Sequence, residues 1–373
     1  MPPPAPYTLP TPGEDWITGA RQRYLRRTAR LLLAWPHPLP AWLARPYEGL
    51  REALGRVLAA RPADLYAALA LPQVGAPLHA GSLAEAVPAL LAELSRRRAI
   101  GREGVFWAAP VKRILCPGTG AALELVPERV GMLFADGEIE LGASEVWDLR
   151  PRGERAFLPM REGGWLALVD DNPLAMVEAH PDKEGNALSL GSATAAEWLA
   201  ALDGARALVR AASPALADEH RSLLATVVPV GGPMEKSLSA SYREAVGTVY
   251  VSLHPSPAKM AEALIHELQH TKLNLLTFVD PVLADGGDEL HASPVRPDPR
   301  PLWGVLLAVH AFVPVAELYF HLGDRARLAE VIAQNREAMG VVARHARPTE
   351  VGRRLIEGLA RVVDEQEARF RGA

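Results

Sequence analysis

Residues 258–276 read AKMAEALIHELQHTKLNLL, and the pattern in this stretch is the starting point for the rest of the fold. Apolar side chains recur along it at the spacing of one helical face: Leu264, Ile265, Leu268, Leu275 and Leu276. Just before it stand Ser256, whose hydroxyl can cap a helix, and Pro257, which suits the first helical position. The sequence therefore predicts a buried helix that starts after Ser256.

The pentapeptide HELQH at 266–270 lies inside this predicted helix. Residues four apart share a helical face, so His266 and His270 can converge on one metal ion with Glu267 beside them. The alternative is a helix whose two histidines are ordinary surface or core residues. The helical context and the start signals favour the metal site, in which Glu267 is the expected catalytic residue.

Two histidines leave a catalytic metal one protein ligand short, since such sites normally take three and keep one position open. A third histidine six residues after His270 is excluded, because position 276 is a leucine. The candidates on the helix predicted to start near Pro301 are His310, Glu317 and His321, and a weaker one is His291 in the preceding segment. We expect His310 to be the third ligand, with Glu317 as the alternative. Each of these two residues can equally be a hydrogen-bonded helix residue.

A second group of candidates follows in 293–303, SPVRPDPRPLW, where prolines fix an extended backbone. Arg296 and Arg300 project from this stiff segment, and guanidinium groups bind carboxylates through two parallel hydrogen bonds. The pair could therefore hold an anionic co-substrate next to the metal. Alternatively, the two arginines pair with Asp298 or Asp288, or face solvent.

The chain as a whole reads as α+β and mainly α-helical. Helical spacing dominates 1–100, after a Pro-rich start that is expected to be an extended arm, and it returns in 191–373, the expected metal-binding catalytic domain. Besides the helix around HELQH, the expected helices lie at about 15–35, 47–60, 63–71, 82–97, 194–227, 302–321, 325–339 and 348–370.

Between these two helical regions, 101–190 holds short apolar runs bounded by turn residues, which predict a small antiparallel sheet. The expected strands are 105–108, 111–115, 123–126, 130–134, 138–141, 156–159 and 165–169. The sequence ADGE at 135–138 is typical of a tight turn between two of these strands.

Composition limits the function classes. The chain has 373 residues, 49% hydrophobic and 23% charged, as expected for a globular protein. Its net charge of −4 gives no basic surface for nucleic acid. The lone Cys116 excludes an intrachain disulfide framework. No apolar run in the sequence reaches membrane-spanning length, and the start resembles no signal peptide. We expect a cytoplasmic protein without a membrane or nucleic-acid partner.

The segments around the pentapeptide resemble one family, the HExxH-motif peptide modification proteins, which are encoded with ribosomally made, post-translationally modified peptides. The stretches that carry the resemblance are 239–241 (SAS), 247–253 (GTVYVSL), 261–276 and 294–302 (PVRPDPRPL). It is specific over about 225–325. His266 and His270 match the family's metal-binding histidines, and Arg296 and Arg300 match arginines of its Pro-rich stretch. Val295 replaces the usual tryptophan, and the family's further histidine falls near Leu307, where His310 is the nearest here.

The resemblance implies an iron(II)- and 2-oxoglutarate-dependent oxygenase that hydroxylates the β-carbon of a residue in a precursor peptide. The implied partners are that peptide and other maturation enzymes. The motif alone favours a zinc metallopeptidase, in which Glu267 is the general base toward a zinc-bound water. A third hypothesis is an accessory module that binds the peptide for a partner enzyme.

Overall fold

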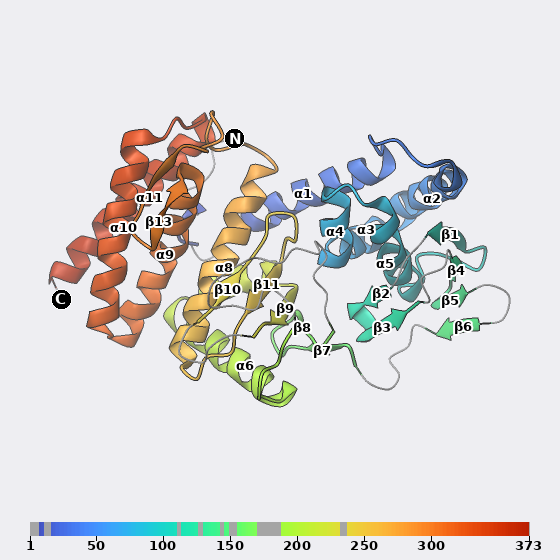
Figure 1. Ribbon diagram of the computed structural model, residues 1–373, viewed down its shortest axis with the longest axis horizontal. Coiled ribbons are helices and arrows are strands. Elements are labelled where there is room, and N and C mark those ends of the chain that lie inside the picture. The colour runs from blue at the N-terminus through green and yellow to red at the C-terminus, as the bar shows by residue number, and fades with distance from the viewer. Residues whose placement is uncertain are drawn as a thin grey trace.

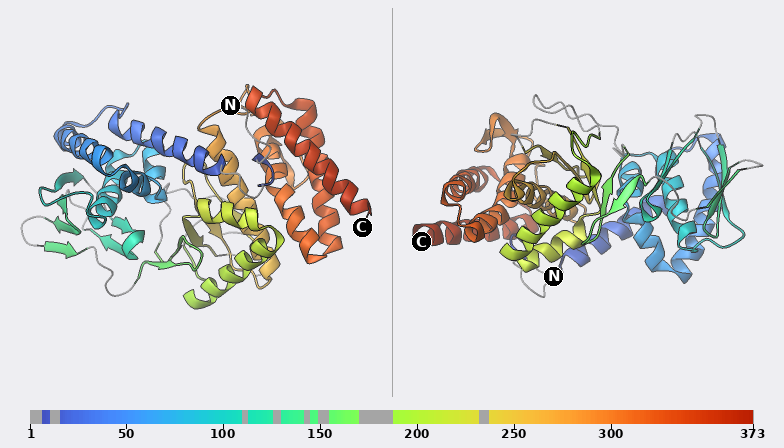
Figure 2. Two further views of the ribbon diagram at one scale, coloured as in Figure 1. Left: turned by 180° about the vertical axis from the view of Figure 1, so that it is seen from behind. Right: turned by 90° about the horizontal axis from the view of Figure 1, so that it is seen from below.

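The helix predicted around HELQH is α8, Pro257–Thr277, and it runs through the middle of the molecule (Figure 1). The side chain of Ser256 accepts a hydrogen bond from the Lys259 backbone N–H and Pro257 is at the first helical position, so the predicted start is confirmed. This computed structural model describes residues 7–10, 16–109, 113–125, 130–141, 145–148, 155–169, 188–231 and 237–372. The N-terminal helices and the C-terminal helices lie at opposite ends of an elongated molecule, with α8 between them (Figures 1 and 2).

The N-terminal end consists of packed helices. They are α1 (Trp16–Leu33), α2 (Ala41–Ala60), α3 (Pro62–Leu69), α4 (Pro72–His79) and α5 (Leu83–Arg96). Helix α4 was not expected, because Gly75 and Pro77 are helix breakers in its short sequence. The structure gives the reason for the glycine: a Cβ at position 75 would lie 2.5 Å from the Tyr24 hydroxyl of α1. Close packing against α1 therefore requires a residue with no side chain.

The middle of the chain forms the predicted small antiparallel strands. Strands β1 (Val105–Ala109), β4 (Val130–Ala135), β5 (Glu138–Leu141) and β6 (Glu145–Asp148) pair in that order, and β2 (Arg113–Cys116) pairs with β3 (Ala121–Glu124). The turn between β4 and β5 places Asp136 and Gly137 at positive φ, which confirms the expected tight turn. Of these strands, β6 is the one that the sequence interpretation missed.

A second sheet, which is mixed, links the middle of the chain to the metal helix. It contains β7 (Phe157–Pro159), β8 (Trp165–Ala167), β9 (Thr226–Pro229), β10 (Ser239–Ala240) and β11 (Thr248–Val251), in the order β10-β11-β9-β8-β7. Strand β9 runs parallel to both neighbours, while β10 and β7 are antiparallel edge strands. The sheet thus joins residues on both sides of the expected boundary near 190, because β8 pairs directly with β9.

Two helices precede β9 where one helical region was expected. These are α6 (Ala195–Ala212) and α7 (Pro214–Leu223). The division falls at Ser213, whose hydroxyl accepts a hydrogen bond from the Leu216 backbone and caps α7, and at Pro214, which starts the new helix. Helix α6 contacts α8, and β10 and β11 contact α8 from the mixed sheet.

The C-terminal end is a hairpin followed by three helices. The hairpin consists of β12 (Leu290–Ser293) and β13 (Arg296–Pro301), and the helices are α9 (Leu302–Leu322), α10 (Arg325–His345) and α11 (Glu350–Gly372). All three helices were predicted. The sequence was expected to hold no apolar run of membrane-spanning length, but among the described residues α9 alone is long and apolar enough to cross a membrane. Of its apolar window, 67% is buried inside the fold, as in the helix of a protein core.

Residues 7–10, predicted to be part of an extended arm, lie at this C-terminal end. Tyr7 and Thr8 are buried, and Tyr7 belongs to the same apolar cluster as side chains of α9, α10 and α11. The buried ammonium of Lys272 on α8 donates to the Thr8 carbonyl at 3.4 Å and forms an ion pair with Glu219 at 2.9 Å. This early segment is therefore part of the packing around α8.

Candidate metal site

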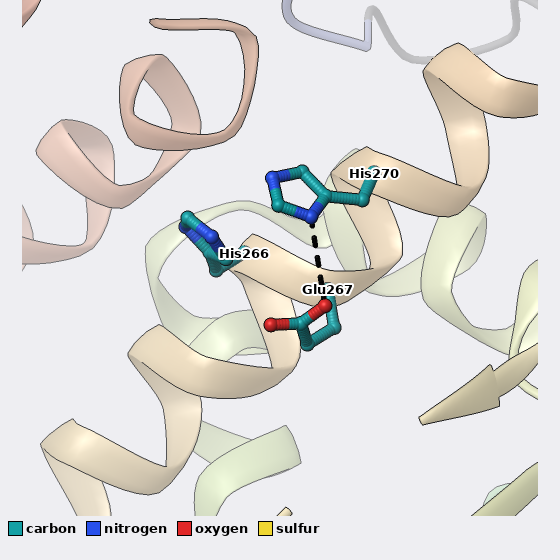
Figure 3. A group of neighbouring side chains, drawn as sticks. All are labelled: His266, Glu267 and His270. Carbon is teal, nitrogen blue, oxygen red and sulfur yellow. Dashed lines mark ion pairs between the residues drawn. The ribbon is translucent and has the colours of Figure 1, made fainter. Parts of the chain in front are cut away.

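His266, Glu267 and His270 form the one group among the described residues with three side chains suited to a metal ion (Figure 3). One ligand atom from each residue lies within 4.8 Å of the others. The two imidazole rings have centroids 4.3 Å apart with an angle of 60° between their planes. One turn of helix thus brings the two histidines together, as their spacing predicts.

Glu267 is held by two serines that the sequence analysis did not assign a role. Ser239 of β10 donates its hydroxyl to Oε1, and Ser241, just after β10, donates to Oε2, each at 2.6 Å. The glutamate is only 2% exposed. The sequence held a signal for this pair, since residues two apart on a strand point to the same side of it.

The carboxylate also lies beside His270. Oε2 of Glu267 is 3.6 Å from Nδ1 of His270, which is an electrostatic contact longer than a well-formed hydrogen bond. Burial alone would raise the pKa of the Glu267 carboxyl. The contact with His270, the charges of His270 and His266, and the Ser239 hydroxyl outweigh burial and lower that pKa to about 2. Glu267 is therefore an ionised carboxylate in the protein interior.

The other ring nitrogen of His270, Nε2, is buried and has no hydrogen-bond partner among the described residues. Buried polar atoms are nearly always paired, so an unpaired imidazole nitrogen beside a second histidine has the character of a metal ligand. His266 packs edge-on against Phe312 of α9, with ring centroids 4.9 Å apart. This apolar contact fixes one wall of the site.

The structure does not bring His310 into this group. Its ring is 1% exposed, and Nε2 lies 2.7 Å from the Tyr7 carbonyl. Burial and the charge of Lys272 lower the pKa of His310 to about 3, against the opposite effect of the Tyr7 carbonyl. A nitrogen that donates a proton to a carbonyl has no lone pair left for a metal, which excludes Nε2 of His310. Its Nδ1 is buried and has no hydrogen-bond partner among the described residues. His310 is therefore a core histidine outside the three-residue group, and its ligand role stays a prediction.

Glu317, the alternative third ligand, is also engaged elsewhere. Its carboxylate accepts a hydrogen bond from Gln366 at 2.7 Å and pairs with Arg369 at 3.0 Å, both on α11. The weaker candidates lie outside the group as well, since His321 is exposed and the His291 ring packs against His345. No third protein ligand beyond the pentapeptide is assembled among the described residues.

The arginines expected to bind a co-substrate lie on β13, in the extended backbone that the prolines predicted. Nε of Arg300 is 3.0 Å from Oδ2 of Asp298, which is the pairing considered as the alternative role. Arg300 remains half-exposed. The backbone of Arg296 belongs to β13, while its side chain lies outside the described part of the structure.

Comparison with models of known protein families gives no match to this sequence, and comparison with curated proteins gives none either.

Proposed function

We propose that the chain is an iron(II)- and 2-oxoglutarate-dependent oxygenase that hydroxylates the β-carbon of a residue in a ribosomally made precursor peptide. The observation that carries the metal site is the paired imidazoles of His266 and His270, with Nε2 of His270 buried and unpaired among the described residues. The choice of co-substrate and peptide rests on the resemblance of 225–325 to the HExxH-motif peptide modification proteins. Iron(II) is a metal that imidazole ligands suit.

Each residue of the group has a distinct task in this proposal. His266 and His270 hold the metal, which when bound would supply the oxidative chemistry with 2-oxoglutarate as reductant. Glu267 places its negative charge beside Nδ1 of His270, and Phe312 keeps one side of the site apolar. Arg300, with Arg296 as its neighbour on β13, is the proposed anchor for 2-oxoglutarate. Arg300 must exchange its contact with Asp298 for one with the co-substrate.

A zinc peptidase is the second candidate, because Glu267 lies in the same group as the two histidines. As a general base, that glutamate would need an oxygen within reach of a metal-bound water. Here each of its oxygens accepts one short hydrogen bond from a serine. A carboxylate oxygen can accept a second one, so this geometry is open to both enzymes, and the choice of the oxygenase rests on the resemblance.

The proposed reaction belongs in the cytoplasm, where the precursor peptide is made. Cys116 agrees with a reducing compartment, because it is buried and unpaired, and burial raises the pKa of its thiol to about 12. We expect no role for this thiol in the chemistry.

Co-expression with the short peptides encoded beside the gene, followed by mass spectrometry, tests the proposal. An oxygenase adds one oxygen atom to a peptide. Purified protein should then release succinate from 2-oxoglutarate only with iron(II), and His270→Ala should release none. Zinc-dependent cleavage of the peptide would contradict the oxygenase and support a peptidase. Binding of an unmodified peptide, with no succinate formed, would contradict it and support an accessory module.

Glu267→Gln separates the two enzymes further. In a peptidase, where Glu267 is the general base, this substitution should abolish hydrolysis even in the fraction of protein that holds metal. In the oxygenase, the fraction that holds metal should still hydroxylate the peptide, because Glu267 is not the base. Weaker metal binding is expected in either enzyme, since the amide removes the negative charge beside His270. Metal content and product are measured on the same preparations.

A further inference from the structure

The serine contacts of Glu267 reach beyond the pentapeptide. Ser239 and Ser241 approach from the edge strand β10 and from the residue after it, so the carboxylate is fixed by the mixed sheet as well as by its own helix. Ser241 also donates to the backbone carbonyl of Glu267 at 3.3 Å. Two donors, one for each oxygen, leave the carboxylate little freedom to rotate.

Hydroxyl donors have a specific consequence for charge. Burying a carboxylate is unfavourable unless it is hydrogen-bonded or paired with a cation. Serine hydroxyls provide the hydrogen bonds without adding a positive charge. The negative charge therefore stays available to its nearest titratable neighbour, Nδ1 of His270 at 3.6 Å.

A carboxylate beside one ring nitrogen of a metal-binding histidine orients the ring, so that the other nitrogen faces the metal. In His270 that other nitrogen is Nε2, the buried atom that has no partner among the described residues. The chain of contacts thus runs from the serines through Glu267 to the nitrogen that would bind the metal.

We propose that Ser239 and Ser241 are positioning residues of the metal site, and that Glu267 acts through His270 instead of activating water. This inference rests on the proposed metal site, although not on the identity of the reaction. It assigns a role to two side chains outside the pentapeptide. In this role Glu267 contacts the ligand His270 and does not contact the metal itself.

Cobalt(II) alone is the probe for the test, because its absorption spectrum reports the ligands without any turnover. Wild type, Ser239→Ala, Ser241→Ala and the double variant are titrated with Co(II), and their melting temperatures are recorded. Loss of an outer partner of a metal ligand typically weakens metal affinity by about 10- to 100-fold, so we expect this for the double variant. Ser239→Thr and Ser241→Thr keep a hydroxyl and should retain most of the affinity.

Ser256→Ala is the matched control. Ser256 caps the same helix through the Lys259 backbone, at a distance along α8 from the pentapeptide. Its loss should lower the melting temperature as a cap deletion does while leaving Co(II) affinity unchanged. A purely structural role for Ser239 and Ser241 would make their alanine variants behave like this control.

The Co(II) absorption spectrum gives a second readout, because it reports the arrangement of the ligands. We expect the double variant to shift the Co(II) bands and Ser256→Ala to leave them unchanged. Unchanged Co(II) affinity and an unchanged spectrum in the double variant would overturn the proposal. A wild type that binds Co(II) but never consumes 2-oxoglutarate would overturn only the oxygenase, whereas one that binds no Co(II) would overturn both.

Discussion

Helices α5 and α8 are both buried in the core, one in each half of the chain. They differ in whether their buried polar side chains have partners. On α5, Glu93 is buried and forms ion pairs with Arg96 and Arg97 at 2.7 and 2.6 Å. Ser95 donates to the Glu138 carbonyl and accepts from the Gly137 N–H. The polar side chains that α5 buries are thus paired within the described structure.

Helix α8 buries polar atoms that are not paired. Both side-chain polar atoms of Gln269 and Nε2 of His270 have no hydrogen-bond partner among the described residues. An unsatisfied buried polar group costs about 1–3 kcal/mol, so a helix used only for packing gains nothing from such residues. In α8 the unpaired atoms include a ring nitrogen of the HELQH group, so the contrast with α5 can be tested at the proposed metal site.

The largest effect that would test this contrast is the loss of a ligand. His266→Ala and His270→Ala should each abolish metal binding, a loss greater than the roughly 100-fold upper figure for removing an outer partner. The fold should persist because Leu264, Ile265 and Leu268 still bury the helix. Metal content is measured by mass spectrometry, and full metal occupancy in either variant would contradict the assignment of these histidines as ligands.

The next effect concerns the proposed anchor for the co-substrate. Arg300→Ala should raise the 2-oxoglutarate requirement about ten- to a hundredfold, which corresponds to a loss of about 1.5–3 kcal/mol for one charge-assisted contact. Peptide dependence should change much less. Succinate release is measured against both substrates, with Asp298→Asn as control, since that change frees Arg300. An equal response to both substrates would argue against an anchor role.

A substitution on α5 should lower the stability of the fold and leave metal binding unchanged. Glu93→Gln should lower the free energy of unfolding by about 1.5–3 kcal/mol, because it removes charged hydrogen bonds in a buried position. Co(II) affinity should not change. Urea denaturation and Co(II) titration of the same variant test the two halves of the comparison, and a weakened metal site would show that α5 and α8 are coupled.

The smallest effect is a pH dependence near α8. Burial, together with the charges of Arg206 and Lys272, lowers the pKa of His220 on α7 from 6.5 to about 3. Between these values the unfolded chain binds a proton that the folded chain does not. Stability should therefore fall as pH falls below 6.5, by up to about 1.4 kcal/mol per pH unit from this residue.

His220→Gln removes that contribution. Urea denaturation at about pH 7.5 and about pH 5.5 should show a smaller difference in stability for the variant than for the wild type. Equal differences would mean that His220 is not held neutral in the fold.

The sequence predicted what depends on neighbours along the chain. Ser256 and Pro257 fixed the start of α8, and the spacing of His266 and His270 brought their rings together. Contacts with partners that are distant in sequence could not be predicted in this way. Nε2 of His310, the expected third ligand, contacts the Tyr7 carbonyl, a group whose position could not be inferred from any local pattern. Helix α4 was missed because the need for a glycine in it comes from a side chain of α1, another helix.

The contacts of Tyr7 and Thr8 with His310 and Lys272 close a loop that encloses most of the chain. Closing a loop of this length costs only slightly more entropy than closing one half as long, since the cost rises with the logarithm of length. Segments at both ends of that loop must be present before the core around α8 is complete. A fragment that starts after the mixed sheet's first strands would leave Lys272 and His310 without these acceptors. The segment at 7–8 should consequently unfold together with α8 and α9, and the metal site should vanish with them.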